Sequence, residues 1–415
     1  MAQKINKYDV VIVGAGVIGS ALALRLAQLH YHVALLDMKS PLFEATDPER
    51  VIALSEGSSR YLKALGVWDA VLAHGAGHIK DIVVLEPDAE TGLNGTNTMD
   101  MSHTEINADA LGYVCEIRHV LQPIQQALES HVENNQVEML CPATCLGFEH
   151  SETGVSLAIQ TEQGKQRIKA QLLVGADGTP SQIRKLAGIE TFGWDHNRMG
   201  IVASITAEQG HGHVAYECFK AQGPLALLPL ADDRFSLVWS VAPRDGVQLL
   251  RLDDQSFLDK LEQEVGQSVL ERTGAFKGIG ERASFPLELR LAKSFAQAGL
   301  ALVGNAAHTI HPIAGQGMNL GLRDVAVLAD VLQQDWAKEN LSSSLVAQTY
   351  AERRRLDTLA VAGFTEGVLE TFGSTIMPTR WLRGQGLNMM QTSPSLKQIL
   401  LQQAAGLAQL KGVQV

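Results

Sequence analysis

The feature that most constrains this chain is a glycine triplet that directly follows an apolar run near the amino terminus. The segment YDVVIVGAGVIGSALALRLAQLHYHVALLD places Gly14, Gly16 and Gly19 between a run rich in valine and isoleucine and a stretch whose leucines recur at helical spacing. The first pattern indicates a buried strand, the second an amphipathic helix, and the closing VALLD a further strand. The chain is therefore predicted to begin with a β-α-β unit, the start of a parallel sheet.

Glycines at this point of a β-α-β unit let a phosphate approach the positively polarised amino end of the helix. Asp37 ends the second predicted strand, where a carboxylate can accept hydrogen bonds from a ribose. The combination predicts a bound dinucleotide, with its pyrophosphate at Gly14, Gly16 and Gly19 and its ribose at Asp37. Because a carboxylate at this position disfavours a 2′-phosphate, FAD or NAD is expected rather than NADP.

Two further apolar runs also end in small residues. GVSLAIQTEQGKQRIKAQLLVGADG leads to Gly175 and Asp177, and GLALVGNAAH leads to Asn305. Parallel strands present their carboxyl ends at one edge of a sheet, so three such ends predict a ligand that lies across that edge. Taken alone, GADG is equally compatible with an ordinary hairpin turn.

The segment HPIAGQGMNLGLRD, residues 311–324, places glycines immediately before a predicted helix. Such a segment leaves backbone N–H groups exposed at the positive end of the helix, where a reduced flavin ring gains about 0.3–1 kcal/mol for its negative charge. Asn319 in this segment is equally compatible with a purely structural role as a partner of the helix N-cap.

Between Thr191 and Ala283 the pattern changes to alternating runs such as GPLALLPL and RFSLVWSV, which indicate an antiparallel sheet. The stretch from His78 to Met101 is predicted to join it, and the chain after Asp324 is mostly helical. A chain of 415 residues is long enough for two domains. We therefore predict an α/β fold with a discontinuous Rossmann-like domain (1–77, 102–190 and 284–345), an inserted antiparallel-sheet domain (78–101 and 191–283) and a helical region (346–415).

Composition excludes several classes of function. A net charge of −11 without basic patches argues against nucleic-acid binding. The amino terminus does not read as a secretory signal and no apolar run suits a membrane span, so a cytoplasmic location is expected. The cysteines form no CxxC pair and match no histidine spacing, so we expect no metal site and predict reduced, buried thiols at Cys115, Cys141, Cys145 and Cys218.

The carboxyl-terminal segment differs in charge from the rest of the chain. Residues 371–415 contain no Asp or Glu, but carry Arg380, Arg383, Lys397 and Lys411. This segment is a candidate to contact anionic lipid on the inner face of a membrane, or an acidic partner. An apolar stripe in it either docks there or packs on the core of the protein itself; its residues are Trp381, Leu396, Ile399, Leu400, Leu407 and Leu410.

GAGVIG, GADG and GNAAH, in this order and spacing, resemble the FAD-dependent aromatic hydroxylases with the fold of para-hydroxybenzoate hydroxylase. HPIAGQGMNLGLRD is similar to the ubiquinone-biosynthesis branch of that family, and GPLALLPL, LVWS and LVGNAAHTIHPIAGQG are most similar to the 2-polyprenyl-6-methoxyphenol hydroxylases. The resemblance covers nearly the whole chain, including a helix with Tyr350, Arg353, Arg354 and Asp357.

The resemblance implies roles for individual residues. The glycine triplet would hold the FAD pyrophosphate and Asp37 the adenosine ribose. Arg50 and Arg118 would approach the phosphates or the ribityl chain; surface ion pairs are the alternative role for both. Asp177 would belong to a motif shared between FAD and the incoming nicotinamide. The residues that would line the flavin ring are Pro312, Gly315, Gln316, Gly317, Met318 and Asn319. The family usually has Asp where this chain has Asn305, and the weaker acceptor predicts looser retention of FAD.

The reaction that the resemblance implies is the reduction of FAD by NAD(P)H, the capture of O₂ at flavin C4a, and the hydroxylation of a polyprenyl phenol. A base near the ring would help the phenol to react, and His311 is our candidate. A histidine that only packs against the loop is an alternative role for His311, and His308 is equally ambiguous. A polyprenyl tail of about forty carbons would cost roughly 30 kcal/mol to withdraw into water, so a membrane surface or other ubiquinone-biosynthesis proteins must cover it.

Three competing functions remain open at this stage. The chain could hydroxylate another position of the ubiquinone ring, or act on a soluble aromatic acid, or serve as a non-catalytic FAD-binding scaffold of the biosynthetic complex. A soluble acid would require an Arg or Lys that faces the flavin from the inserted domain. The candidates there, Arg198 and Arg234, are predicted to flank turns rather than to sit in an apolar strand.

Overall fold

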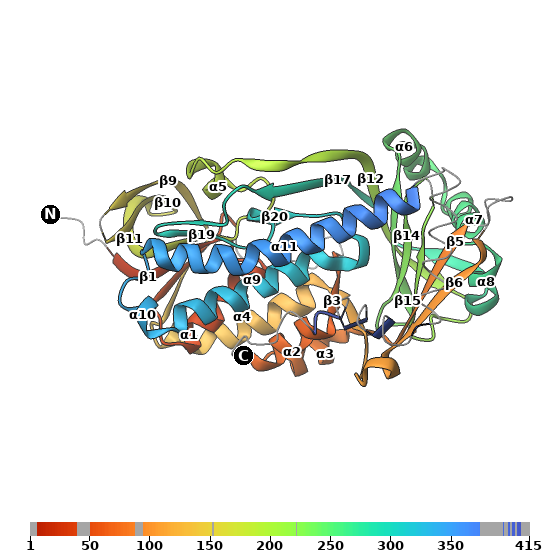
Figure 1. Ribbon diagram of the computed structural model, residues 1–415, viewed down its shortest axis with the longest axis horizontal. Coiled ribbons are helices and arrows are strands. Elements are labelled where there is room, and N and C mark those ends of the chain that lie inside the picture. Colours follow the sequence, from red (N-terminus) through yellow and green to blue (C-terminus); the bar gives the residue numbers. More distant parts are fainter. Residues whose placement is uncertain are drawn as a thin grey trace.

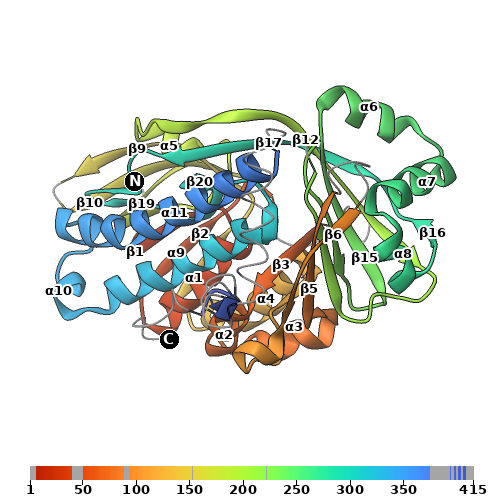
Figure 2. The same cartoon turned by 45° about the vertical axis from the view of Figure 1, so that its right-hand side comes forward.

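The computed structural model describes residues 6–39, 50–87, 94–151, 153–220 and 222–373, together with 393, 397–398, 401–402 and 405–407. Two domains lie side by side along the long axis of the molecule (Figure 1). The long strands β12 (Thr191–Ala207) and β17 (Ala283–Ala292) run from one domain into the other. Helix α11 (Ser344–Gly373) crosses one face and reaches from the first domain to the second (Figure 2).

The first domain is built on a sheet that contains β1 (Asn6–Val13), β2 (Val33–Leu36), β8 (Val137–Leu140), β9 (Ala143–Ser151), β10 (Gly154–Thr161), β11 (Gly164–Gly175), β18 (Ala296–Gln297) and β19 (Leu300–Leu302). Its order is β18-β19-β11-β1-β2-β8. The five strands from β19 to β8 are parallel, and β9 and β10 form a hairpin that joins through β11. The predicted parallel sheet is confirmed.

Helices α1 (Val17–Gln28) and α4 (Ile117–Glu133) pack on this sheet, α11 contacts its strand β18, and α9 (Gln316–Gln333) packs on α1 and α11. Helix α1 contacts α4 and α9, and α9 contacts α11. Every residue of α9 from Asn319 to Leu332 is buried. The helix that follows the glycine-rich segment is therefore a central element of the domain. The remaining helices near it are α2 (Glu56–Ala64), α3 (Trp68–Gly75), α5 (Gln182–Leu186) and α10 (Asp335–Lys338).

A small antiparallel sheet connects the two domains. It consists of β3 (Val51–Ser55), β7 (Gly112–Glu116) and β4 (Gly77–Ile79), in that order. Strand β4 also contacts β14 (Leu225–Pro229) of the second domain. Short 3₁₀ turns complete the connections at η1 (His103–Ile106), η2 (Gly304–Ala306) and η3 (Ile313–Gly315).

The second sheet has the order β20-β17-β12-β15-β14-β13-β5-β6, and β16 pairs with β12. All its pairs are antiparallel except β13 with β5, which run parallel. Strands β17 and β20 extend this sheet beyond the predicted 191–283, while the domain limits themselves stay a prediction. The strands not yet given are β5 (Asp81–Pro87), β6 (Asn94–Ser102), β13 (Val214–Cys218), β15 (Arg234–Val241), β16 (Phe276–Ile279) and β20 (His308–Thr309).

Three helices that the sequence patterns did not predict cover one face of this sheet: α6 (Pro243–Arg251), α7 (Asp254–Val265) and α8 (Gln267–Thr273). The first residues of α6 and α7 are of types that commonly begin a helix. Pro243 occupies the first helical turn, and the Asp253 side chain accepts a hydrogen bond from the Ser256 amide at the start of α7. Phe257 and Leu261 of α7 are fully buried against this face of the sheet.

Most of the acid-free carboxyl-terminal segment lies outside the described residues, including Arg380, Arg383, Lys411, Trp381, Leu396, Ile399, Leu400 and Leu410. Lys397 is described: it is buried, and its Nζ lies 2.9 Å from a carboxylate oxygen of Glu105. Leu407 is partly buried. At least one basic residue of this segment is therefore used within the protein. Among the described helices, none is both long and apolar enough to span a bilayer.

Candidate active site

The three glycine-containing motifs lie next to one another at the carboxyl edge of the first sheet. Strands β1, β11 and β19 are neighbours that end at Val13, Gly175 and Leu302. The Ala176 amide donates to the Val13 carbonyl at 2.8 Å, and the Val303 amide donates to the Gly175 carbonyl at 2.9 Å. The prediction that three strand ends meet at one edge is confirmed.

The glycines of the first motif differ in the space that surrounds each of them. A Cβ on Gly14, whose φ is +112°, would lie 2.3 Å from the Ala176 carbonyl oxygen, and a Cβ on Gly19 would lie 1.8 Å from the Gly14 carbonyl oxygen. A Cβ on Gly16 would meet no atom within 4 Å. Gly14 and Gly19 therefore permit close packing, whereas Gly16 faces open space. Helix α1 begins there without a side-chain cap, so its first N–H groups can receive an anion.

Asp37 is half-buried at the end of β2 and closes the same turn. Its Oδ2 accepts a hydrogen bond from the Ala15 amide at 2.8 Å, and its Oδ1 accepts one from the Lys39 amide at 3.0 Å. A carboxylate has about four lone-pair sites, so each oxygen can accept a further hydrogen bond. The carboxylate is thus positioned beside the glycine turn and retains capacity for ribose hydroxyls.

The GADG motif is tied to the GNAAH motif by an arginine. The buried Arg184 donates to the Ala306 carbonyl at 2.7 Å and to the Thr179 carbonyl at 2.8 Å. Asp177 accepts from the Ser181 hydroxyl and from two amides at the start of α5, so its carboxylate caps that helix. Asn305 is exposed, and its Nδ2 lies 3.5 Å from the Thr179 hydroxyl.

The start of α9 repeats the arrangement found at α1. Gly315 precedes the helix with a φ of +60°, and a Cβ on it would lie 2.5 Å from the Ala53 Cβ. A Cβ on Gly317 would meet no atom within 4 Å, and the helix has no side-chain cap. The first N–H groups of α9 are therefore accessible at the positive end of the helix.

Asn319 has a structural role, although its side chain does not cap the amides of α9. Its Oδ1 accepts from the Ser55 amide at 2.8 Å and the Ser58 hydroxyl at 2.7 Å, and its Nδ2 donates to the carbonyls of Ala53 and Gly315. Because these partners belong to β3, to α2 and to the residue before α9, the Asn319 amide links the three elements.

Asp324, which closes the glycine-rich segment, anchors a buried ionic cluster. Its Oδ2 accepts from the Gly304 amide at 2.7 Å and lies 2.7 Å from Nε2 of His308, while its Oδ1 accepts from Arg354 at 2.6 Å. Burial by itself raises the pKa of a carboxyl, but His308 and Arg354 hold the pKa of Asp324 below its usual value. His308 is therefore a structural residue that links the GNAAH motif to α9. Arg354 also pairs with Asp357.

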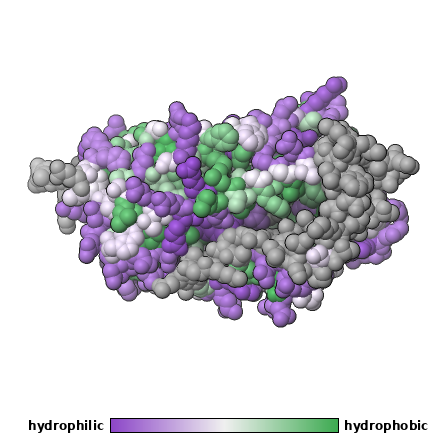
Figure 3. Space-filling model, in the orientation of Figure 1, coloured by the Kyte–Doolittle hydropathy of each residue, from purple (hydrophilic) through white to green (hydrophobic). Residues whose placement is uncertain are grey.

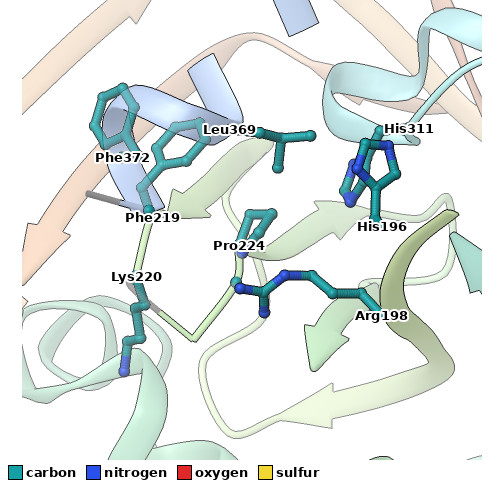
Figure 4. A pocket seen from close by; sticks show the side chains of 10 residues that line it. His196, Arg198, Phe219, Lys220, Pro224, His311, Leu369 and Phe372 are labelled. Carbon is teal, nitrogen blue, oxygen red and sulfur yellow. The ribbon is translucent and has the colours of Figure 1, made fainter. Parts of the chain in front are cut away.

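His311 lies in a small pocket of about 80 Å³ between the domains (Figure 4). Its side chain is 1% exposed, and neither ring nitrogen has a hydrogen-bond partner among the described residues. The ring of His196 is close, with centroids 5.4 Å apart. Burial, together with the charges of His196 and Arg198, lowers the pKa of His311 to about 3. The imidazole is therefore neutral and a weak base, and its predicted role as the proton acceptor for a phenol stays a prediction.

Arg198 lies inside β12, where the sequence had suggested a turn. The register of β12 against β17 shifts between Asp195 and Arg198, and this irregularity directs the guanidinium to line the His311 pocket. Burial lowers the pKa of Arg198. Arg234 begins β15 and its Nε lies 2.6 Å from Asp232, as expected for a residue that flanks a turn.

A second, almost entirely apolar cavity of about 250 Å³ borders the start of α9. One side is formed by β3, η3 and α9, and the opposite side by the inner face of the second sheet. Helix α11 contributes Phe364, Val368 and Phe372 to the wall. Phe372 stacks on Phe219 with ring centroids 4.1 Å apart, and both rings also line the His311 pocket. The two spaces are therefore adjacent and separated by this aromatic pair.

Comparison with known proteins identifies the family. Residues 7–363 match the family model described as the FAD binding domain. This chain belongs to that FAD-binding family. The 3-demethoxyubiquinol 3-hydroxylase of Escherichia coli K12 is 34% identical over 403 residues, which cover 96% of this chain and 98% of that protein. The ubiquinone hydroxylase UbiL of Rhodospirillum rubrum is 33% identical over 407 residues, which cover 97% of this chain and 90% of that protein.

The fold is also that of flavoprotein monooxygenases. The crystal structure of p-nitrophenol 4-monooxygenase PnpA from Pseudomonas putida matches with a TM-score of 0.79 at 17% identity, covering 99% of this chain and 100% of that chain. The predicted resemblance to FAD-dependent hydroxylases of ubiquinone biosynthesis is thus confirmed at the level of the family. The closer resemblance to the methoxyphenol branch stays a prediction.

The residues at the sheet edge fit FAD. The open space at Gly16 lies at the uncapped start of α1, where a pyrophosphate finds free N–H groups, and Asp37 stands beside it for the ribose. The open space at Gly317 lies at the uncapped start of α9, which suits the electron-rich edge of a flavin. Two helix starts of the same kind thus suit the pyrophosphate and the flavin ring of one extended cofactor.

The other residues predicted for FAD occupy mixed positions. Arg50 is exposed, and its carbonyl accepts from the Ile117 amide, which brings β3 beside the start of α4. Arg118 is partly exposed and pairs with Glu116 at 2.6 Å, so the alternative of an ion pair describes its present contact. Their roles toward FAD stay predictions, as do those of three residues around η3 and α9. Of these, Gln316 lines the apolar cavity, Pro312 is partly buried, and Met318 packs against the core of the first domain.

Proposed function

We propose that this chain is an FAD-dependent monooxygenase that hydroxylates the ring of a neutral polyprenyl phenol in ubiquinone biosynthesis. The proposed substrate is 2-polyprenyl-6-methoxyphenol, the proposed reductant is NAD(P)H, and O₂ supplies the oxygen atom. The observation that carries the proposal is the apolar cavity that borders the start of α9, next to the FAD-binding residues. A substituted ring with a neutral hydroxyl is the chemistry that such a lining accepts.

The charge of the cavity argues against a soluble aromatic acid. Among its described lining residues there is no Arg or Lys, and Glu217 is the single ionisable side chain. A carboxylate ligand has no Arg or Lys to pair with among the described residues that line this cavity, and burying a charge without such a partner is unfavourable. Arg198 lines the neighbouring His311 pocket instead. The charge pattern therefore supports a neutral phenol.

When bound, FAD supplies the activation of O₂ and the transfer of an oxygen atom to the ring. The residues of this chain hold and enclose the reacting groups. Gly16 and Gly317 admit the cofactor to two helix ends, and the walls from β5, β6, β13 and α11 exclude water from the ring. Because the chain retains both the cofactor-binding glycines and an enclosed cavity beside them, a purely non-catalytic scaffold role is disfavoured.

The size of the cavity indicates where a polyprenyl tail would go. A volume of about 250 Å³ is below the roughly 300–1,000 Å³ of pockets that enclose drug-sized ligands, so the tail extends outside. Phe364 lines the cavity and is nevertheless 56% exposed, and Leu356 and Leu359 of the same helix are also exposed. Hydrophobic surface is visible on the face of the molecule that α11 crosses (Figure 3). We propose that the tail leaves past Phe364 and is covered by a membrane surface or by a lipid-carrying partner protein.

A second candidate differs only in the ring position. The Escherichia coli relative that covers nearly the whole chain is named for hydroxylation of 3-demethoxyubiquinol, and this name favours the corresponding polyprenyl ring as an alternative substrate. The apolar cavity is equally compatible with both rings.

The function is tested with the gently purified protein and with cells that lack it. We expect a yellow protein whose visible spectrum shows bound flavin, and phenol-dependent oxidation of NAD(P)H with one oxygen atom added to the ring by mass spectrometry. Cells without the chain are expected to accumulate a polyprenyl methoxyphenol; accumulation of the demethoxy ring would favour the second candidate. A colourless protein that FAD does not reconstitute, or an unchanged quinone profile, would contradict the proposal.

A further inference from the structure

Buried polar atoms without a hydrogen-bond partner gather around the His311 pocket. Among the described residues there are eight buried side-chain atoms of this kind, and four of them lie here: Nδ1 and Nε2 of His311, Nε2 of His196 and Oε1 of Glu366. Such an atom costs a fold about 1–3 kcal/mol, so native proteins contain few of them. Their concentration at one place indicates that a partner from outside the chain binds there.

Two elements bring these side chains together. The irregularity in β12 leaves His196 without a partner residue in β17, so its ring is free to turn away from the ladder. The rings of His196 and His311 lie against each other at one side of the pocket (Figure 4), and Nε2 of His196 lies 3.3 Å from Oε1 of Glu366 on α11. The three side chains form a row that begins at a ring 1% exposed and ends at a carboxyl 21% exposed.

The partner that fits this row is water. Burial lowers the pKa of His311 to about 3 and also lowers that of His196, so both rings are neutral. A neutral imidazole has one N–H donor and one lone-pair acceptor. An anion would satisfy only the donor and a metal ion only the acceptor, whereas water satisfies both. The pocket of about 80 Å³ has room for several molecules, because one water needs about 10–15 Å³.

We propose that the His311 pocket holds a chain of bound water which, together with His311, His196 and Glu366, carries protons from the solvent to the reaction site at the start of α9. The inference rests on the proposed function, because that reaction consumes a proton in a closed site: NAD(P)H, O₂, a proton and the phenol become NAD(P)⁺, water and the hydroxylated ring. His311 directly precedes Pro312, in the segment predicted to line the flavin ring.

Each member of the chain gains one proton and releases another, so none of them is consumed. Glu366 takes a proton from the solvent and passes one to Nε2 of His196, whose other nitrogen releases its proton to the bound water. The water passes a proton to one nitrogen of His311, and the other nitrogen releases one toward the start of α9. Burial raises the pKa of Glu366, which favours a carboxyl that can donate. Phe219 and Phe372 lie between this water and the apolar cavity.

The first test is a crystal structure of the FAD-loaded protein at a resolution that shows ordered water. We expect water within hydrogen-bond distance of both ring nitrogens of His311, with a further hydrogen bond that continues toward His196. This readout does not depend on the activity of the protein. A pocket without water, or water bonded to neither nitrogen of His311, would overturn the inference.

The second test asks whether the chain carries protons. The variants are His196→Ala and Glu366→Gln, and the matched control is Glu370→Gln, an exposed glutamate about one turn further along α11 that does not line the pocket. We expect each variant to lower kcat about 100-fold, the lower end of what positioned proton transfer contributes, with KM for the phenol and the bound flavin unchanged. The control is expected to match the wild type.

Chemical rescue separates proton transfer from packing. Added imidazole is expected to restore turnover in His196→Ala, because it accepts a proton at one nitrogen and releases one from the other. The compound 1-methylimidazole also fills the space but has no N–H, so it is expected to restore nothing. Equal rescue by both compounds, or wild-type kcat in both variants, would overturn the relay while the proposed function stood.

Failure of the proposed function has a different signature. A wild-type protein that binds FAD but hydroxylates no phenol would overturn the proposed function and the relay together. The water site would even then be decided by the crystal structure, because it follows from the unpaired atoms of His311 and not from the reaction.

Discussion

At the level of single residues, the three glycines of the first motif differ in what surrounds them. Gly14 and Gly19 face backbone atoms closer than any Cβ tolerates, whereas Gly16 faces open space. Gly16 also has an ordinary backbone conformation, with a φ of −70°. The protein itself therefore excludes side chains at Gly14 and Gly19, and at Gly16 we attribute the need for glycine to the cofactor.

We predict that Gly16→Val folds normally but loses FAD. The valine side chain enters the space beside the start of α1 that the pyrophosphate requires. The measurement is the flavin absorbance retained after gel filtration, together with the unfolding midpoint of the FAD-free protein. Gly147→Val is the control, because Gly147 also faces open space but lies on β9 away from the motif. Full retention of flavin in Gly16→Val would refute the placement of the pyrophosphate.

His311 supports a prediction about pH. Its pKa is about 3 in the folded protein and about 6.5 when the ring is exposed, so the unfolded chain binds the proton first as the pH falls. The folded state therefore loses about 1.2 kcal/mol of stability between neutral pH and pH 5.5 through this group. We predict that His311→Gln reduces the loss by about this amount, whereas the exposed His150→Gln leaves it unchanged. The measurement is the unfolding free energy from urea titrations at neutral pH and at pH 5.5. If His311→Gln and the wild type lose the same stability between these pH values, the burial of a neutral ring is contradicted.

At the level of elements, the packing of α9 on α11 depends on charged side chains buried between them. Asp324 of α9 contacts Arg354 of α11, and Arg323 of α9 contacts Asp357 of α11 at 2.8 Å. Tyr350 of α11 donates to the Leu302 carbonyl at 2.8 Å, at the end of β19. The same contacts hold the GNAAH motif, so the geometry of the cofactor site depends on this helix pair.

We predict that Asp324→Asn destabilises the protein by about 3–5 kcal/mol, because it leaves the buried Arg354 without one of its carboxylates. The stabilising effect of Asp324 is present above the ordinary pKa of a carboxyl and is lost as the pH falls, since its pKa is lowered in the folded state. Asp335→Asn is the control. It breaks an exposed pair with Lys338 and is expected to cost less than about 1 kcal/mol. Similar urea midpoints for the two variants would show that the cluster contributes little.

At the level of the whole molecule, the cavity joins the two domains. Ala53 and Gln316 come from the first domain, Glu217 and Leu228 come from the second, and Val368 of α11 closes the wall between them. A ligand that fills the cavity therefore contacts both domains at once. Binding to the folded state alone stabilises the molecule as a unit.

We predict that ortho-propylphenol at a free concentration of about 100 times its dissociation constant raises the unfolding free energy by about 2.7 kcal/mol. The measurement is a thermal melt of the FAD-loaded protein with and without the ligand, with ortho-propylbenzoate as the matched control. The benzoate is expected to leave the midpoint unchanged at equal concentration. An unshifted midpoint at saturating phenol would contradict a site between the domains.

Much of the architecture could be predicted because it is encoded locally. The glycine triplet, the two other strand ends and the alternating runs of the inserted domain each fall within short segments, and the structure assembles them as expected. Helices α6 to α8 were not predicted although Pro243 and Asp253 mark two of their starts, because the alternation of the flanking strands obscures a helical period. Arg198 was misplaced because a register shift inside a strand has no local signal.

Local sequence was sufficient to indicate a dinucleotide across one edge of a parallel sheet, since Gly14, Gly16, Gly19 and Asp37 act within one β-α-β unit. Tertiary contacts were needed to separate the polar residues that serve the fold from those that face a ligand space. Asp324, from the glycine-rich motif, is an anchor for Arg354, while Glu217, in no motif at all, faces the cavity. The physical reason is that a side chain's role depends on partners that other strands and helices bring to it, and these partners lie far away along the chain.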